Sequence, residues 1–432
     1  MNSVRHSFDV LVVGAGPAGM AAACCASESS LRVGIVDNNP QPGGQIWRGA
    51  SQHSAIPEAA DWYKRLAASR VEVLSSTEVY DQPAPGELAA DSPKGACEIA
   101  YAKLILCTGA RERFLPFPGW TLPNVIGAGG LQALVKSGFS IADKKIVVAG
   151  SGPLLLAVAA YLREHGGDVL LIAEQSPWRA LIRFGLTVAF QKEKLAQSFQ
   201  LRRQLSGVPY QAGCWPVAAK GNGQLESVTL RSGNKTWEER CDYLACGFFL
   251  VPNVELPMLL GCELRGGFVR VDEFQQTTVS EVLCAGEPAG IGGLELSLVE
   301  GQIAGYAAAG NCEAARKLFA ERNRSRHFAA ALHRAFGLRD ELRSLPDDAT
   351  FVCRCEDVTF ARLRKHSSWR AAKLQTRCGM GPCQGRICGP AVELLLGWKV
   401  ESVRPPIFPV AVSSLAKSVL MQSQSSMHEE LR

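Results

Sequence analysis

Short apolar runs recur along the chain, and most of them end at glycines or small polar residues. The runs are Asp9–Val13, Val33–Val36, Leu104–Cys107, Lys145–Ala149, Val169–Ile172 and Val282–Cys284. Continuous apolar runs of this length are typical of strands that are covered on both faces in a parallel sheet. Helix-like stretches rich in alanine and leucine follow the first and fourth runs. The pattern therefore predicts an α/β fold.

The first run leads directly into a dinucleotide-binding fingerprint. Gly14 allows a tight turn, Gly16 lets a pyrophosphate approach the backbone, and Gly19 lets the following helix lie close to the strand. The next run ends at Asp37, 23 residues after Gly14, where a carboxylate can accept hydrogen bonds from an adenosine ribose. Strand, motif, helix, strand and acid occur in the required order, which predicts a nucleotide site.

A second unit of the same kind begins at Lys145. Its loop carries Gly150 and Gly152, but Leu155 stands where the third glycine belongs, so the helix must stand slightly off the strand. The following strand ends close to Glu174, and a carboxylate there favours NAD over its phosphorylated form. A scaffold that binds another adenine nucleotide, or nothing, fits this segment as well.

The cysteines of the C-terminal part have ligand spacing. Cys353 and Cys355 are separated by one residue, and Cys383 and Cys388 lie in the glycine-rich run GMGPCQGRICGP. Four thiolates hold an iron–sulfur cluster or tetrahedral zinc, and the dinucleotide-binding motifs of the chain favour the redox centre. Cys378 lies five residues before Cys383 and allows an alternative ligand set. The ten cysteines before these lack ligand spacing and are expected to be structural.

Composition narrows the possible functions. A chain of 432 residues is expected to form two or three domains. Its charge of +5 is spread over 46 basic and 41 acidic residues without a basic block, which argues against nucleic acid as a partner. The cysteine pattern fits the reducing cytosol, although association with a membrane through partners stays open, and no run is apolar enough to span a membrane. The glycines near the N-terminus argue against a signal peptide.

Three further motifs give the chain a resemblance to flavoproteins with two dinucleotide-binding domains, such as thioredoxin reductase. They are Gly43-Gly44-Gln45, Thr108-Gly109-Ala110 and the acidic Ala285-Gly286-Glu287. The resemblance implies that Gly44, Gln45, Thr108, Gly109 and Glu287 line FAD, and that the second unit is inserted in the first and binds NAD(P). The stretch between Gly127 and Gly150 contains no cysteine, so the redox CxxC of thioredoxin reductase is missing.

Taken together, the motifs PGGQIWR, TGARER, AGEPAGIGG, VCRCEDVT and TRCGMGPCQGRIC resemble the alpha subunits of heteromeric amino-acid and opine dehydrogenases. That group includes opine oxidases, D-hydroxyproline and L-proline dehydrogenases and hydrogen cyanide synthase. The resemblance implies a small helical [2Fe-2S] domain similar to bacterioferritin-associated ferredoxin, with Cys353, Cys355, Cys383 and Cys388 as ligands. It also implies that the partner is an FAD-containing amine-oxidase-like beta subunit. FMN at an interface between subunits and a small ferredoxin-like subunit are further candidates.

The expected organisation has five parts. They are an FAD-binding domain (1–136 and 266–312), an inserted NAD(P)-binding-like domain (137–265), a helical linker (313–348), a [2Fe-2S]-binding domain (349–403) and an extended tail (404–432), disordered after Met421. The resemblance implies an electron-transfer subunit whose partner oxidises an amino acid, an imino acid or an opine. A self-sufficient NAD(P)H:acceptor reductase and a scaffold with a non-catalytic nucleotide site are the alternatives.

Overall fold

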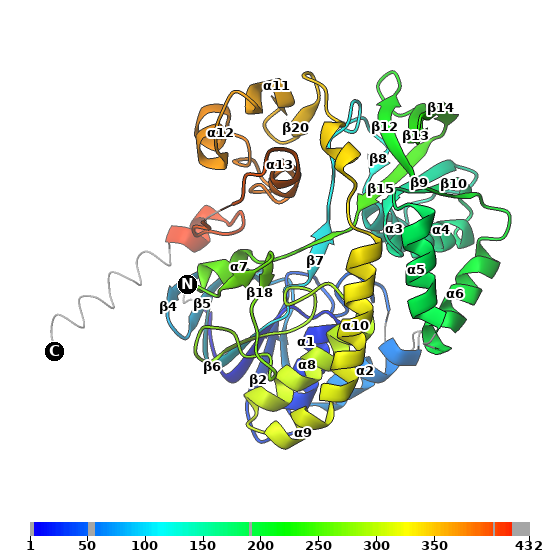
Figure 1. Ribbon diagram of the computed structural model, residues 1–432. Coiled ribbons are helices and arrows are strands. Elements are labelled where there is room, and N and C mark those ends of the chain that lie inside the picture. Colours follow the sequence, from blue (N-terminus) through cyan, green and yellow to red (C-terminus); the bar gives the residue numbers. More distant parts are fainter. Residues whose placement is uncertain (1–3, 51–56, 190–191, 401, 417–432) are drawn as a thin grey trace. The chain divides into compact units, whose positions relative to one another are not determined.

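A computed structural model describes residues 4–50, 57–189, 192–400 and 402–416 of the protein (Figure 1). The chain forms two compact units, and each is assembled from separate segments. Unit 1 comprises Met1–Ala110, Pro252–Ala329 and Glu401–Arg432, and unit 2 comprises Arg111–Val251 and Ala330–Val400. The predicted disorder after Met421 concerns residues outside the described part. No helix of the described residues is both long and apolar enough to cross a membrane.

Unit 1 is built on a seven-stranded sheet in the order β3-β2-β1-β6-β5-β4, with β19 paired to β6. The strands predicted from the apolar runs are parallel to one another, and β4 and β5 add an antiparallel edge. The strands of this sheet are β1 (Val4–Val13), β2 (Val33–Val36), β3 (Glu72–Leu74), β4 (Glu78–Ala84), β5 (Glu87–Ser92), β6 (Gly95–Leu106) and β19 (Val282–Cys284). Two further strands, β17 (Leu264–Arg265) and β18 (Phe268–Val269), form a separate antiparallel pair. The helices are α1 (Pro17–Ala26), α2 (Pro57–Ala68), α7 (Glu255–Leu259), α8 (Leu294–Ala308) and α9 (Cys312–Lys317).

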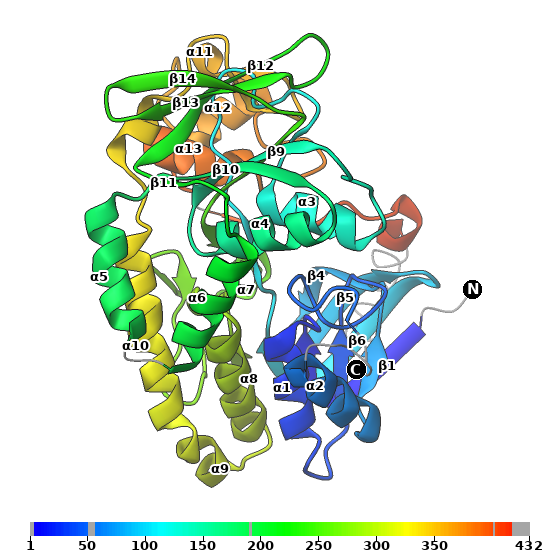
Figure 2. The same cartoon turned by 90° about the vertical axis from the view of Figure 1, so that its right-hand side faces the viewer.

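Glycines set the close packing of the helices in unit 1. α1 lies against the sheet, and both α2 and α8 pack against α1 (Figure 2). A Cβ added at Gly301 would lie 2.2 Å from the carbonyl oxygen of Ala18, and one added at Gly305 would lie 2.2 Å from that of Ala22. No larger side chain fits at either position, so these two glycines bring α8 against the helix that follows the first glycine loop.

Residues 402–416 also belong to unit 1. The amide of Ile407 donates to the carbonyl of Tyr80 over 2.9 Å, and the Ser414 hydroxyl donates to Asp91 over 2.8 Å. Ile407 is buried in the same apolar core as Leu88 and Leu106. This segment therefore packs across the strands β4, β5 and β6.

Unit 2 contains a five-stranded parallel sheet, in the order β11-β10-β9-β15-β8, and a three-stranded antiparallel sheet of β12, β13 and β14. The strands are β8 (Val125–Ile126), β9 (Lys145–Ser151), β10 (Asp168–Glu174), β11 (Tyr210–Ala212), β12 (Cys214–Lys220), β13 (Ser227–Ser232), β14 (Lys235–Arg240) and β15 (Tyr243–Phe248). The helices are α3 (Ala128–Lys136), α4 (Leu154–Glu164), α5 (Trp178–Ala189) and α6 (Lys192–Gln204). Strands β7 (Ala110–Glu112) and β16 (Leu250–Pro252) lie where the chain passes between the units.

Residues 111–136 belong to unit 2, whereas the sequence places them with the flavin-binding part. The physical reason is that β8 pairs with β15 in the parallel sheet, and Leu131 and Val135 of α3 are buried in the core beside that sheet. The boundary between the two dinucleotide folds therefore falls directly after Thr108-Gly109-Ala110.

The cysteine-containing segment is also part of unit 2. Its elements are η1 (Asp340–Ser344), β20 (Phe351–Cys353), β21 (Val358–Thr359), α11 (Phe360–Leu363), α12 (Trp369–Thr376) and α13 (Cys388–Leu396), preceded by α10 (Phe319–Ala335), which crosses the unit boundary. Val352, Val358 and Val392 form its own small core. We call residues 349–400 the cysteine module.

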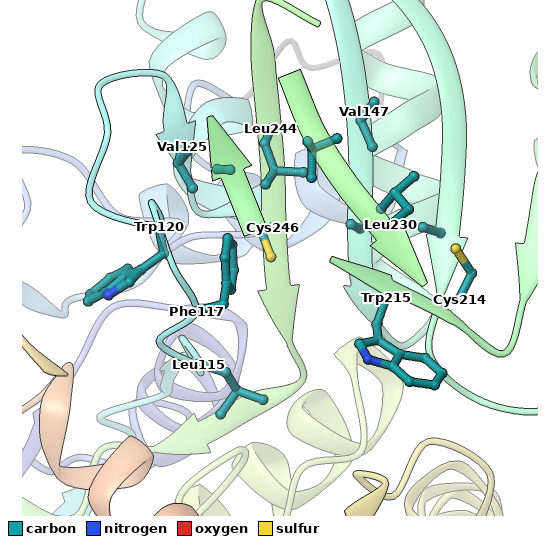
Figure 3. Packing of buried hydrophobic residues seen from close by; sticks show 14 of the residues in the cluster. Leu115, Phe117, Trp120, Val125, Val147, Cys214, Trp215, Leu230, Leu244 and Cys246 are labelled. Atoms are coloured by element: carbon teal, nitrogen blue, oxygen red, sulfur yellow. The ribbon is translucent and has the colours of Figure 1, made fainter. Parts of the chain in front are cut away.

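An apolar cluster joins the two halves of unit 2. Figure 3 shows Trp120, Trp215 and Leu244, which come from the loop before β8, from β12 and from β15. Leu342 of η1 is fully buried in this cluster, and Leu394 of α13 packs against it. The cysteine module is thus attached to the inserted dinucleotide fold by a continuous apolar core.

Candidate functional site

The first glycine loop lies at the carboxyl end of β1. An added Cβ at Gly14, where φ is +102°, would lie 2.3 Å from the carbonyl oxygen of Cys107, and one at Gly19 would lie 1.8 Å from that of Gly14. Gly16 differs, because its φ is −70° and the atom nearest to an added Cβ is the Cα of Gly44 at 3.9 Å. The fold itself requires the first and third glycines, whereas the second leaves space for a ligand.

Asp37 holds this loop from the end of β2. One carboxylate oxygen accepts the backbone N–H of Ala15 over 2.5 Å, and the other accepts that of Asn39 over 2.7 Å. The side chain is 9% exposed. The acid thus lies beside the loop, where the sequence expects a contact with ribose.

The Gly43-Gly44 turn packs on the loop and brings a cation to it. Gly43 donates to the carbonyl of Ala15 over 2.8 Å. Arg48 donates to the side-chain oxygen of Gln45 over 3.0 Å and to that of Asn39 over 3.2 Å. Its Nε is buried without a partner among the described residues. Sequence reasoning missed Arg48, although it is the cation of the quoted PGGQIWR motif, and it can receive an anionic oxygen beside the loop.

Thr108 and Gly109 have different roles at the end of β6. The Thr108 hydroxyl donates to the carbonyl of Asn253 over 2.6 Å, and the Asn253 amide returns a bond to the Thr108 carbonyl over 2.8 Å. Gly109 has a φ of +70°, and no atom lies within 4 Å of an added Cβ. The threonine side chain therefore holds the backbone, and the glycine borders open space.

Glu287 has a carboxyl oxygen that the described residues do not satisfy. Its Oε1 accepts the N–H of Gly293 over 3.2 Å, while its Oε2 is buried without a partner among them. Burial raises the pKa of this carboxyl to about 7. The neighbouring Glu300 is fully used, because it accepts from Gly286 and pairs with Arg326 over 2.8 Å. A buried oxygen in this position calls for a hydrogen-bond donor from a bound group.

The second glycine loop, at the carboxyl end of β9, is arranged differently. A Cβ at Gly150 would lie 1.8 Å from the carbonyl of Gly247, and one at Gly152 would lie 3.2 Å from the ring of Phe249. Leu155 is buried in the core beneath the sheet. The side chain of Phe249 therefore occupies the space that lies open at Gly16 in the first loop.

Glu174 does not face an open crevice. It is fully buried, one carboxylate oxygen accepts the N–H of Gly152 over 2.8 Å, and the other accepts that of Ser176 over 2.8 Å. Burial raises the pKa of this carboxyl. The acid expected to select NAD is instead a buried acceptor for the backbone of its own loop.

The structure brings five cysteines of the cysteine module together. The sulfur atoms of Cys353, Cys378 and Cys388 lie within 4.8 Å of one another, and all three residues are buried. The sulfurs of Cys355 and Cys383 are 3.6 Å apart and nearer to solvent. The four predicted ligands line one cavity of about 110 Å³. Cys378 does not line this cavity, although its sulfur lies beside those of Cys353 and Cys388.

The backbone around these sulfurs stabilises negative charge. Hydrogen bonds from the thiols of Cys378 and Cys388, and from the N–H groups of Gly379 and Glu356, hold the pKa of Cys353 far below its usual range. The same sharing raises the pKa of Cys378 and Cys388. Thiols bind a metal ion as thiolates, so a cation held by these sulfurs would favour the deprotonated form of each of them.

Close backbone packing explains the glycines of this segment. A Cβ at Gly381 would lie 2.3 Å from the Cβ of Cys355, and one at Gly379, where φ is +79°, would lie 2.7 Å from the Trp369 ring. The cysteines without ligand spacing behave as structural thiols, because burial raises the pKa of Cys107 and Cys246, for example. Cys312 is the exposed exception.

Two Rossmann-type folds in one chain, with an open glycine loop and an unsatisfied acid in the first, define a class of flavin-dependent oxidoreductases. Residues 8–310 match the family described as pyridine nucleotide-disulphide oxidoreductase, and the chain belongs to this family. It is 30% identical over 468 residues to an opine oxidase subunit of Agrobacterium tumefaciens (strain Ach5), which covers 95% of this chain and 91% of the relative. It is 29% identical to hydrogen cyanide synthase subunit HcnB of Pseudomonas aeruginosa, over 88% and 90% of the two chains.

Solved structures agree with this assignment of the fold. L-proline dehydrogenase from P. horikoshii aligns with a TM-score of 0.66 at 19% identity, over 96% of this chain and 80% of that one. Thioredoxin reductase of Lactococcus lactis aligns with a TM-score of 0.53 at 20% identity, over 73% and 99%. The resemblance to opine oxidase and hydrogen cyanide synthase subunits expected from the sequence motifs is confirmed.

Proposed function

We propose that this chain is the FAD- and [2Fe-2S]-containing electron-transfer subunit of a heteromeric dehydrogenase or oxidase. The substrate is an amino acid, an imino acid such as proline or hydroxyproline, or an opine, and its C–N bond is oxidised in an FAD-containing beta subunit. The observation that carries the proposal is the cavity lined by Cys353, Cys355, Cys383 and Cys388 in a chain of flavoprotein fold. The opine oxidase and hydrogen cyanide synthase relatives are themselves named as subunits, which supports a partner.

Unit 1 fits FAD. Gly16 leaves room for a pyrophosphate. Within the described part of the chain, the buried Nε of Arg48 and the buried Oε2 of Glu287 have no partner, so the first can donate to an anion and the second can accept from a hydroxyl. Asp37 lies at the end of β2, beside the place for an adenosine ribose. A flavin bound there supplies an exchange of one or two electrons, which makes it a suitable neighbour for a one-electron cluster.

The cysteine module fits a [2Fe-2S] cluster better than an apolar core. The cavity is close to solvent on the side of Cys355 and Cys383 and buried on the side of Cys353 and Cys388. Backbone N–H groups of Gly379 and Glu356 point at the Cys353 sulfur, and such bonds stabilise an anionic cluster. Cys378 lies close enough to Cys353 and Cys388 to serve as a reserve ligand, but it does not line the cavity, so we assign the cluster to the other four.

Amine oxidation is assigned to a partner because the buried acids of this chain are engaged elsewhere. Glu300 pairs with Arg326, Asp37 holds the first loop, and Glu174 holds the second. Glu287 lies in the expected flavin site. General acid–base catalysis on an amine needs a group within hydrogen-bond reach of the substrate, and these groups are already bonded to the protein or reserved for the cofactor.

Co-expression with a neighbouring amine-oxidase-like subunit tests the proposal. The isolated chain should hold about two irons and two labile sulfides. It should show no dye reduction with amino acids, hydroxyprolines or opines, and activity should appear when the partner is added. A Cys312→Ser variant is the matched control, because Cys312 is exposed and is not one of the cysteines with ligand spacing. This variant should keep both iron and activity. Stoichiometric zinc without iron after anaerobic preparation would sink the cluster assignment, and turnover of an amine by the isolated chain would sink the assignment to a partner.

A further inference from the structure

The place where a dinucleotide would bind in unit 2 is defined by the topology of its parallel sheet. In the order β11-β10-β9-β15-β8, the direction of progression changes between β9 and β15. Ligands of such sheets bind outside the carboxyl ends of the strands at this switch point. In unit 2 these ends are Ser151 of β9, Glu174 of β10 and Phe248 of β15.

An aromatic ring covers the second glycine of the loop. Phe249 directly follows β15 with a φ of +67°, a conformation that a bulky side chain rarely adopts. This conformation places its ring 3.2 Å from the position of an added Cβ at Gly152, and the ring packs edge-on against His333 with 5.2 Å between centroids. The surface at which a pyrophosphate must approach the backbone is therefore already occupied.

The chain that leaves α10 satisfies the polar groups at the strand ends. The Ser151 hydroxyl donates to the carbonyl of Phe336 over 3.1 Å. The Gln175 amide donates to the carbonyl of Gly337 over 3.1 Å and accepts the N–H of Arg339 over 3.2 Å. Both side chains are buried. Residues 336–339 thus make hydrogen bonds with the groups that a nucleotide would otherwise use.

The acid of the motif is likewise unavailable. Both carboxylate oxygens of Glu174 accept backbone N–H groups, as those of Asp37 do in the first loop, but Glu174 has no exposed surface whereas Asp37 is 9% exposed. The packing continues outward, because the Phe336 ring contacts Phe184 of α5 with 5.3 Å between centroids, and the Arg339 guanidinium lies 4.4 Å from the centroid of the Trp215 ring. Phe336 and Arg339 are thus held by side chains of α5 and β12 as well as by the strand ends.

We infer that the inserted dinucleotide fold binds no NAD(P). Its crevice is a docking site for residues 336–339, the segment that leads through Leu342 into the cysteine module. The inserted fold then serves to hold the cysteine module, and reducing equivalents do not enter this chain from a nicotinamide. The inference depends on the contacts around Gly152, Ser151, Glu174 and Gln175, all within unit 2, so it stands independently of the proposed flavin, cluster and partner.

Titration of the purified, FAD-loaded chain with NADH and NADPH tests the closed crevice without any mutation. Calorimetry should detect no saturable binding, and anaerobic mixing should leave the flavin oxidised. Saturable binding that alters hydrogen exchange at Ser151 or in residues 336–339 would overturn the inference. Binding that leaves exchange in these segments unchanged occupies another place and agrees with it.

Hydrogen exchange tests the docked segment directly. The Arg339 amide donates to Gln175, so it should exchange slowly in the wild-type protein, and Gln175→Ala should accelerate it at least about ten-fold while the β9 amides stay protected. Gln224→Ala, at an exposed position of the same unit, is the matched control and should change nothing. Exchange of the wild-type Arg339 amide at the rate of an unstructured peptide would show that the segment is not docked.

Discussion

The two glycine loops of this protein share a sequence pattern and differ in what lies beyond the second glycine. At Gly16 the nearest atom to an added Cβ is 3.9 Å away and the backbone conformation suits any residue. At Gly152 the φ is +106° and the Phe249 ring lies 3.2 Å from the same position. The comparison shows that the motif builds the turn in both units. The residues that follow neighbouring strands decide whether the turn can receive a ligand.

The sharpest way to break this comparison is to fill the open loop. Gly16→Val adds atoms where the nearest atom of the described residues to the new Cβ is the Cα of Gly44 at 3.9 Å, but where a pyrophosphate must pass. FAD should therefore be lost, with an affinity at least about 100-fold weaker, or about 3 kcal/mol. The fold of unit 1 and the iron content should remain. Flavin absorbance and iron analysis of the purified variant measure both. Full FAD occupancy in a folded variant would show that the site is misplaced.

A substitution of a cysteine of the cavity should have the opposite effect on the two proposed cofactors. Cys388→Ser removes one of the four thiols of the cavity, so iron should be lost while flavin is retained. Cys378→Ser leaves the four lining cysteines in place and should keep most of the iron. Iron analysis and electron paramagnetic resonance of the reduced proteins distinguish the two. Equal loss in both variants would make Cys378 a ligand.

A substitution at Gly152 in the second loop should lower the free energy of unfolding and leave the ligand content of the protein unchanged. Gly152→Val forces a β-branched residue to a φ of +106° beside the Phe249 ring, and strain plus overpacking should cost about 4 kcal/mol of unfolding free energy. Flavin content should not change. Gly223→Val, at a φ of +80° with no atom within 4 Å of an added Cβ, isolates the backbone contribution and should cost about half as much. Urea unfolding followed by tryptophan fluorescence measures both. Equal costs would mean that Phe249 does not close the loop.

The smallest effect is expected for Glu287 of unit 1 and concerns how the stability of the protein without flavin depends on pH. Burial raises the pKa of Glu287 to about 7, above the value of an unfolded chain. The folded state therefore binds more protons between about pH 4.5 and 7, and stability falls as pH rises through this window by at most about 3 kcal/mol. Glu287→Gln should remove this part of the slope. Unfolding curves at several pH values compare the two, and identical slopes would show that the carboxyl is solvated.

Much of the architecture follows from the sequence because it depends on local patterns. The apolar runs at Val33–Val36 and Val169–Ile172 became the parallel strands β2 and β10, and Gly14 and Gly150 became turns that tolerate no side chain. These signals lie within a few residues of the structure that they specify, so a single sequence suffices to identify them.

The parts that sequence reasoning missed depend on contacts between distant residues. Phe336 lies far along the chain from the Ser151 that it covers, and a segment rich in charge gave no sign that Leu332 and Phe336 are buried. Arg48 belongs to the PGGQIWR motif, but the burial of its Nε becomes apparent only in the folded structure. The state of Glu174 was equally hidden, because an acid after a strand has the same sequence pattern whether it faces a ribose or its own loop.

The interleaved course of the chain has a consequence for how the protein is made. The unit 1 sheet is incomplete until β19 emerges, after the whole of residues 111–251, and residues 402–416 reach Tyr80 and Asp91 only after the cysteine module is synthesised. The three segments of unit 1 are therefore synthesised at different times, and the part of β6 that pairs with β19 stays unpaired until β19 has been translated. Chains usually fold one domain at a time from the N-terminus, and exposed edges in waiting intermediates favour aggregation. Slow or stalled translation after Val251 should therefore favour aggregation of the incomplete protein.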